Sequence, residues 1–421
     1  MEFKNPGLEL KGAKILCVSV VAMVLLSSLE NLREIVGIFA YWVMICVPFI
    51  LILARKLKTR SLFFSTENME KQWRVMLVFF LLYMASFITS WLVSDIFAVS
   101  SFLKYSALAA LLAILVVLQP SIDMIVKGLK IASVFSLVVL WGLILFRWQE
   151  GLHFYPGRFG TAVAFPGILW KVGIYLMPWA ALAVFKKANL KHVFWFIVAM
   201  SLIVLDGSRT GFLFTILIIP VMGLMSRFVI KEGGSFWLKA GCMLAVILLV
   251  SSVAKPILWQ ATNDWLTASS SSLDSSLPER ANTAEYVLSA DVTRLDMLLS
   301  GIYQAVDNFP WGGGVLSTTV PAYGIDMVIH MAYLQVLSDQ GVAGFVGFSG
   351  LFFIPLLVFF KKIRGQCLDA KSLRANTIAI AIVMIYAGHG LFHPVSNTIS
   401  EWGVVLLAMA VLINKSESVR V

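Results

Sequence analysis

Long runs of apolar residues follow one another along most of the chain, and short polar segments separate them. A helix needs about 20 mainly apolar residues to cross a bilayer, and it satisfies its own backbone polar groups inside the hydrocarbon. The pattern therefore predicts an all-α polytopic membrane protein with about 12 transmembrane helices. The predicted spans are 13–29, 34–54, 75–93, 97–118, 128–147, 167–185, 192–206, 211–227, 236–254, 340–360, 375–393 and 396–414.

One long polar segment divides this series of spans. Residues 1–254 contain the first nine predicted transmembrane helices, and residues 330–421 contain the last three. Residues 255–329 connect them and resemble a soluble subdomain in composition. A serine-rich stretch at 269–278 is typical of a flexible loop. We therefore expect three parts, with the connecting loop on one side of the membrane.

The second half of this loop has the pattern of an amphipathic helix. Apolar residues recur at helical spacing from Leu295 to Val306, and Asp291 or Thr293 is the expected N-cap. Pro310 and the glycine-rich residues after it would end the helix. We expect the helix to lie near the membrane surface, because one face is apolar and the other polar.

Composition and charge agree with a membrane protein and indicate its orientation. Hydrophobic residues make up 59% of the chain and charged residues 13%, whereas about a quarter of the residues in soluble domains are charged. The net charge of +10 does not indicate a nucleic-acid partner, because most Lys and Arg residues lie in alternate short loops. By the positive-inside rule these loops and both chain ends are expected on the cytoplasmic side. The long loop is then expected on the outer side.

No cofactor or metal site is predicted. The four cysteines lie far apart, without a CxxC pair or a Cys/His cluster, and no nucleotide-binding fingerprint is present. His389 and His393 lie one helical turn apart, but only Glu401 could complete a ligand set with them. Glu401 and Trp402 are interpreted as an anchor at the membrane interface, with the wall of a site as the alternative.

Basic residues on the outer side are few, so each is a candidate for function. Arg209 lies in the segment that runs from Asp206 to Arg209 between the seventh and eighth spans. An arginine at this depth is costly unless an anion or a carboxylate neutralises it. The alternative is an Asp206–Arg209 pair that only holds the turn.

Two other arginines and one histidine share this side. Arg158 lies in a turn-rich approach to the sixth span, where a solvated loop residue is the alternative. Arg294 lies in the first turn of the predicted amphipathic helix, where a cation opposes the helix dipole unless Asp291 or Asp296 pairs with it. His330 lies at the outer membrane boundary, where an imidazole could act as a general base or have only a structural role.

Arginine in this pattern suits a phosphate ligand. The guanidinium fork binds phosphate oxygens in bidentate fashion, and a departing diphosphate needs such neutralisation. Because no nucleotide-binding motif is present, the expected donor is a lipid diphosphate.

Four short segments, in this order, resemble the O-antigen ligase and O-antigen polymerase superfamily of bacterial envelopes. They surround the long outer loop and cover roughly residues 155–350. The segments are Gly157-Arg158-Phe159-Gly160-Thr161, Gly207-Ser208-Arg209-Thr210, Thr293-Arg294-Leu295 through Asn308-Phe309-Pro310-Trp311-Gly312-Gly313-Gly314, and Ile329-His330-Met331-Ala332-Tyr333-Leu334-Gln335 through Gln340-Gly341-Val342-Ala343-Gly344.

The resemblance implies roles for the matching residues. Arg209 and Arg294 would hold the donor diphosphate, Arg158 would assist, and His330 would activate or orient the acceptor hydroxyl. The implied protein is a metal-independent, inverting O-antigen ligase of the bacterial inner membrane with its active site facing the periplasm. Its partners would be an undecaprenyl-diphosphate-linked glycan, a lipid A–core acceptor and membrane lipids.

Three other functions remain open at this stage. A polymerase of the same superfamily would join lipid-linked repeat units, and a related transferase would place the glycan on a protein. A transporter of lipid-linked sugars would instead place ionisable groups near the bilayer midplane. The candidate residues lie at the outer edge, which favours a transferase over a transporter.

Overall fold

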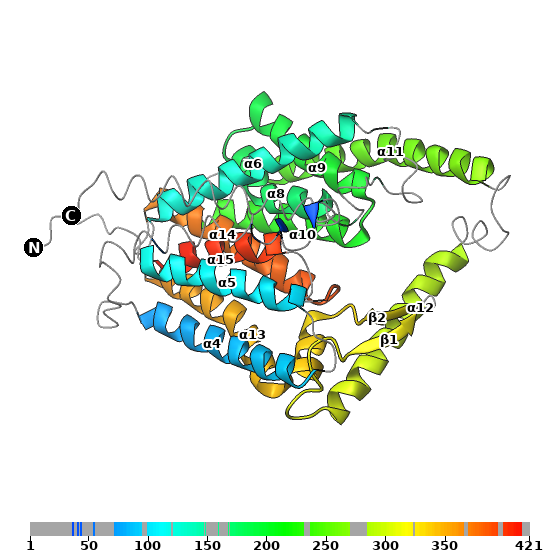
Figure 1. Ribbon diagram of the computed structural model, residues 1–421. Coiled ribbons are helices and arrows are strands. Elements are labelled where there is room, and N and C mark those ends of the chain that lie inside the picture. Colours follow the sequence, from blue (N-terminus) through cyan, green and yellow to red (C-terminus); the bar gives the residue numbers. More distant parts are fainter. Residues whose placement is uncertain are drawn as a thin grey trace, which may run out of the picture.

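The computed structural model is a bundle of helices with a helix and a short hairpin at one end (Figure 1). Predicted span 13–29 and nearly all of 34–54 lie outside the described residues, as does the serine-rich stretch after residue 269. The structure describes residues 71–94, 99–118, 121–146, 169–230, 236–269, 284–322, 325–365, 369–394 and 399–414, with isolated positions 36, 37, 40, 41, 43, 54, 148, 159 and 167.

The other ten predicted spans coincide with helices. The described elements are α4 (Lys71–Leu92), α5 (Val99–Leu118), α6 (Ile122–Phe146), α8 (Leu169–Lys186), α9 (Leu190–Asp206), α10 (Arg209–Leu224), the π-helix η2 (Met225–Val229), α11 (Phe236–Ser269), α12 (Ala284–Asp307), β1 (Thr319–Ala322), β2 (Ile325–Val328), α13 (Ala332–Arg364), α14 (Ala370–His389) and α15 (Ile399–Ile413). Among the described residues, six helices are long and apolar enough to cross a membrane, and Ser101–Val116 and Glu401–Ile413 are shorter apolar helices. The protein is therefore a helical, multi-pass membrane protein.

The helices alternate in direction (Figure 1). The lysines at the starts of α4 and α14 and at the ends of α8 and α13 therefore lie at one end of the bundle. At this end Lys362 Nζ donates to Asn414 O at 2.7 Å, and Trp73 Nε1 donates to Asn414 Oδ1 at 2.8 Å. Lys371 of α14 forms an ion pair with Asp123 of α6. We call this the basic end, and the end that holds Arg209, Ala332, His389 and Glu401 the opposite end.

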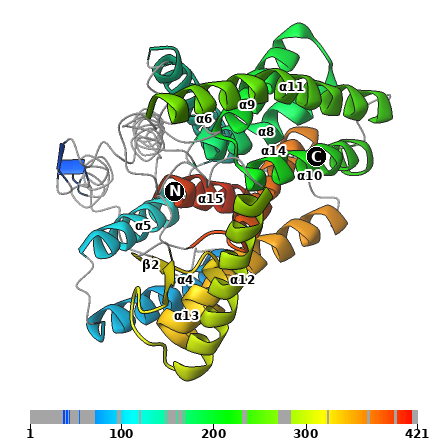
Figure 2. The same ribbon diagram turned by 90° about the vertical axis from the view of Figure 1, so that its right-hand side faces the viewer.

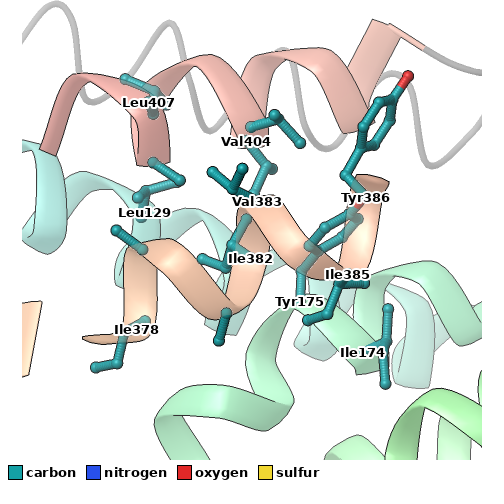
Figure 3. Close-up of a cluster of buried hydrophobic side chains, with 14 of the residues drawn as sticks. Leu129, Ile174, Tyr175, Ile378, Ile382, Val383, Ile385, Tyr386, Val404 and Leu407 are labelled. Carbon is teal, nitrogen blue, oxygen red and sulfur yellow. The ribbon is translucent and has the colours of Figure 1, made fainter. Parts of the chain in front are cut away.

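The core of the bundle is apolar and surrounds α14. Figure 3 shows α14 between α15 and α8, with α6 alongside, and their buried side chains directed toward one another. Ile382 of α14 is 1% exposed, and Leu407 of α15 is 2% exposed. This packing fixes the positions of the three helices whose ends form the candidate site.

Glycines bring α13 directly against α4. Gly344, Gly347 and Gly350 recur at three-residue spacing on α13. A Cβ atom on Gly347 would lie 2.6 Å from Tyr83 N, and one on Gly350 would lie 2.1 Å from the Phe79 ring. Small residues allow such close backbone approach between membrane helices. The α4–α13 pair therefore depends on glycine at these positions.

A kink at Gly341 interrupts α13, because this residue has φ 71° and ψ −168°. Irregular backbone at membrane depth is tolerated where the protein itself satisfies its polar groups. The glycine-rich segment 310–314 and two serines of α4 do this here, so two of the four sequence segments form one structural unit. The bonds are Ser90 Oγ to Asp339 O (2.6 Å), Gly314 N to Asp339 O (3.1 Å), Ser86 Oγ to Gln340 O (2.8 Å) and Val342 N to Pro310 O (2.9 Å).

The loop between the spans differs from the prediction in three respects. The apolar part of α11 ends at Ala254, as the predicted span does, but the helix itself continues through Pro256 to Ser269, which was not predicted. The helix α12 begins at Ala284, so neither Asp291 nor Thr293 is its N-cap, although it does end before Pro310. The antiparallel hairpin of β1 and β2 was not predicted, because each strand has only four residues.

The apolar residues predicted for α12 form its exposed face. Met297 and Ala305 are instead the buried residues, and Gly301 packs so closely that an added Cβ would lie 2.7 Å from Ile329 Cδ1. Small side chains thus dock α12 on the hairpin and on the start of α13. The exposed set is Leu295, Leu298, Leu299, Ile302, Tyr303 and Val306.

Gly341→Ala should destabilise the protein by about 1–3 kcal/mol, because an L-residue is strained at this φ. Its Cβ would also lie 2.2 Å from Pro310 O. Thermal unfolding in detergent would measure the loss. Gly142→Ala in α6 is the matched control, since nothing lies within 4 Å of its added Cβ. Equal unfolding temperatures for the two variants would contradict the strained kink.

Candidate functional site

The turn that carries Arg209 is built by two helix caps. The helix α9 ends at Asp206, and Gly207 closes it in the left-handed region at φ 69°. Ser208 is the N-cap of α10, and its Oγ accepts from Gly211 N at 3.2 Å. Arg209 is therefore the first residue of α10 and is exposed, as the predicted break between two spans requires. A guanidinium exposed at the start of a helix can pair with an anionic ligand.

Asp206 serves α8 as well as the turn in which it lies. Its buried carboxylate accepts from Gly167 N at 2.8 Å and from Trp170 N at 3.2 Å through Oδ2. Asp206 therefore does more than hold the turn that carries Arg209. The carboxylate fixes the start of α8, and with it the position of Trp170.

His330 precedes α13 by two residues and lies against the end of α14. Ala332 N donates to Gly390 O at 2.7 Å, and Tyr333 Oη donates to Ala387 O at 2.9 Å. These bonds hold the chain next to His330 beside the turn after α14. The ring centroids of His330 and His393 lie 6.4 Å apart. His330 itself is partly exposed.

Trp170 connects the Arg209 helix with the histidines. A Cβ atom on Gly211, two residues after Arg209, would lie 2.9 Å from Trp170 Cε3. On its other side the Trp170 ring lies 5.0 Å from the His389 ring and 6.0 Å from the His393 ring, between centroids. The structure thus brings the Arg209 turn and the His330 segment to the same region of the opposite end.

Glu401 connects two further helices at this region. Its Oε1 lies 2.5 Å from Lys171 Nζ, and its Oε2 lies 3.0 Å from His389 Nδ1. Glu401 is 1% exposed and Trp402 is 2% exposed, so their interpretation as an interface anchor is wrong. Removing one partner from such a buried ionic contact costs about 3–5 kcal/mol, because a buried charge is left uncompensated.

A second buried carboxylate positions the approach to His330. Asp339 accepts from Leu316 N at 3.1 Å, from Thr318 N at 3.0 Å and from the Thr318 hydroxyl. Ile329 N in turn donates to Thr318 O at 3.4 Å. These hydrogen bonds connect the residues on both sides of the hairpin to α13, and His330 is the next residue after Ile329.

His393 lies in the turn after α14 and is uncharged at neutral pH. Burial, together with the nearby His389 and Lys171, lowers the pKa of its imidazole to about 2. In the described ranges, no group of three or more His, Cys, Asp and Glu residues is arranged to hold a metal ion.

Two predicted site residues are not placed by these contacts. Arg158 lies outside the described residues, although its neighbour Phe159 is described and donates to Leu205 O at 2.9 Å. Arg294 lies within α12, but its side chain is not described. Because α12 begins at Ala284, Arg294 is not in the first turn, and the expected conflict with the helix dipole is wrong.

Sequence reasoning missed the roles of Trp170, Lys171, His389 and Glu401. One signal was available, since ionisable residues inside apolar helices are costly and normally face a partner within the bundle. Chemically, the site combines an exposed guanidinium at a helix start with a partly exposed imidazole, which suits an anionic ligand and a hydroxyl group.

A scan against models of known protein families and a search of curated proteins found no match to this chain.

Asp206→Ala should destabilise the protein by about 1–3 kcal/mol, because the N–H groups of Gly167 and Trp170, of which the second is buried, lose their acceptor. Thermal unfolding in detergent would measure this. Asp369→Ala is the control: Asp369 also caps a helix, accepting from Ser372 N at 3.1 Å, but it is exposed. The loss of stability in Asp369→Ala should be smaller than that in Asp206→Ala. A larger loss for Asp369→Ala would show that Asp206 does not hold α8.

Proposed function

We propose that this protein is an O-antigen ligase, which transfers a polymerised glycan from undecaprenyl diphosphate to lipid A–core. The observation that carries the proposal is the common location of the Arg209 turn and the His330 segment, through Trp170 and His393, at one end of a membrane helix bundle. An anion-binding group and a hydroxyl-binding group at the membrane surface are what such a transfer requires.

The proposed orientation places the basic end in the cytoplasm and the opposite end in the periplasm of a bacterial inner membrane. The lysines at the basic end support this by the positive-inside rule. The proposal includes about 12 spans and a periplasmic loop that contains α11 beyond the membrane, α12 and the hairpin. The exposed apolar face of α12 would contact the outer leaflet, because such a face is stabilised by lipid.

In the proposed reaction the acceptor hydroxyl attacks the anomeric carbon of the donor glycan. The bond from that carbon to the diphosphate oxygen breaks with inversion. Guanidinium groups neutralise the departing diphosphate: Arg209 from the start of α10, with Arg294 and Arg158 as the further candidates. His330 orients the hydroxyl or takes its proton.

Arg209→Ala should lower transfer by about 100-fold or more, because the charge-assisted hydrogen bonds to the leaving diphosphate are lost. Arg209→Lys should restore only part of the rate, since an ammonium lacks the bidentate fork. The measurement uses purified protein, lipid-linked glycan and lipid A–core, with and without a chelator. Arg227→Ala is the control, because Arg227 is an exposed arginine on η2 at the basic end. Full transfer by Arg209→Ala would refute the diphosphate assignment.

Loss of the protein in cells separates a ligase from a polymerase. A ligase-deficient cell should carry bare lipid A–core while lipid-linked polymer accumulates, because the donor is made but not transferred. Gel analysis of lipopolysaccharide and of the lipid-linked pool measures both. Core that carries a single repeat unit would instead indicate a polymerase. Movement of a labelled lipid-linked sugar across vesicles without transfer would indicate a transporter.

A further inference from the structure

The Glu401–His389 contact determines the tautomer of a buried imidazole. Glu401 Oε2 lies 3.0 Å from His389 Nδ1, and the two side chains are 1% and 3% exposed. A carboxylate accepts hydrogen bonds, so the proton of neutral His389 lies on Nδ1 and its Nε2 is left as an acceptor. This is the arrangement in which a carboxylate orients an imidazole and stabilises its protonated form.

This imidazole and two neighbouring rings carry buried nitrogen atoms without a hydrogen-bond partner. They are His389 Nε2, His393 Nε2 and Trp170 Nε1. Their three rings lie within 4.2–6.0 Å of one another, between centroids. Buried polar atoms in folded proteins are nearly always satisfied, so a cluster of such atoms indicates a functional role.

Three histidines form a line from the surface to Glu401. His330 and His393 are partly exposed, whereas His389 is 2% exposed. Ring centroids are separated by 6.4 Å between His330 and His393 and by 4.2 Å between His393 and His389. Lys171, Glu401 and Tyr386 are the other titratable groups facing this line from α8, α15 and α14. A neutral His393 can both accept and donate a proton.

We propose that His330, His393 and His389 conduct the acceptor's proton inward to a site stabilised by Glu401. This inference rests on the proposed function and deepens it. As the acceptor oxygen bonds to the anomeric carbon and the carbon–diphosphate bond breaks, the hydroxyl proton passes to His330. It moves through His393 to His389, whose Nδ1 lies 3.0 Å from Glu401 Oε2. After the lipid diphosphate leaves, the proton returns to water by the same path.

In this scheme His393, His389 and Glu401 are positioning residues that act through His330. Glu401→Gln keeps an acceptor for His389 Nδ1 but removes the charge. Turnover should fall about tenfold or more, with KM for donor and acceptor nearly unchanged. The acid limb of the pH–rate profile should move to lower pH, because a neighbouring carboxylate favours protonated histidine and its removal disfavours it.

Two further variants keep this test decisive. His393→Gln interrupts the line without touching the Lys171–Glu401 pair, so it should show the same loss of turnover with a normal unfolding temperature, even if Glu401→Gln folds poorly. Asp123→Asn is the control for charge removal, because Asp123 pairs with Lys371 at the basic end, and it should leave rate and pH profile unchanged.

Imidazole nitrogen NMR gives a readout independent of transfer, since the chain has only five histidines. In labelled protein in lipid nanodiscs, His389 should keep its proton on Nδ1, and Glu401→Gln should shift the signals of His389, His393 and His330 together. Wild-type turnover and pH profile in both Glu401→Gln and His393→Gln, with Arg209→Ala inactive, would overturn the proton path alone. Full transfer by Arg209→Ala and by His330→Ala would overturn the proposed function itself.

Discussion

The buried carboxylate of Glu401 contacts one residue from each of two other helices, and the candidate site depends on this contact. Lys171 comes from the first turn of α8, and His389 is the last residue of α14. A buried carboxylate is stable only when it is paired, so the three helix ends must meet. Trp170 precedes Lys171 in the chain and is fixed by Asp206 from α9. The position of the Arg209 turn follows from the same contact.

A second set of contacts, around α13, brings His330 to the candidate site. Glycines pack α13 against α4, the kink at Gly341 is satisfied by segment 310–314, and Asp339 holds the residues before the hairpin. The two sets of contacts meet where Ala332 N donates to Gly390 O. Figure 2, which views the opposite end, shows α12 and the hairpin in front of α13. The His330 segment therefore reaches the candidate site at the end of the bundle that α12 and the hairpin cover.

The sequence predicted the helices well and the contacts poorly, for physical reasons. Apolar runs such as α4 and α14 are long enough that membrane insertion decides their structure locally. The start of α12 and the length of α11 were missed because those segments are polar, and polar helices carry little signal beyond their caps. The apolar residues of α12 were predicted correctly, but they form its exposed face. The face that packs on the hairpin and α13 consists of Met297, Gly301 and Ala305, and two of these are too small to stand out in a hydrophobic pattern.

Partners among charged residues depend on how distant segments fold together. Arg209 and His330 were singled out because cations and an imidazole are rare on the outer side, and the structure places their segments in one region. Glu401 was misinterpreted because nothing near it in the sequence indicates Lys171 or His389. Local pattern thus identifies which residues are costly, whereas only the packed bundle shows which of them compensate one another.

The most direct test of how the His330 segment reaches the site is a cross-link between the start of α13 and the turn after α14. A Cβ atom on Gly390 would lie 3.4 Å from Ala332 Cβ, close to the separation in disulfides. In a cysteine-free background, the pair Ala332→Cys and Gly390→Cys should form a disulfide in native membranes under mild oxidation, whereas Ala332→Cys with Gly142→Cys should not. A pair at 332 and 390 that stays reduced while each single cysteine reacts with a thiol reagent would contradict the common site.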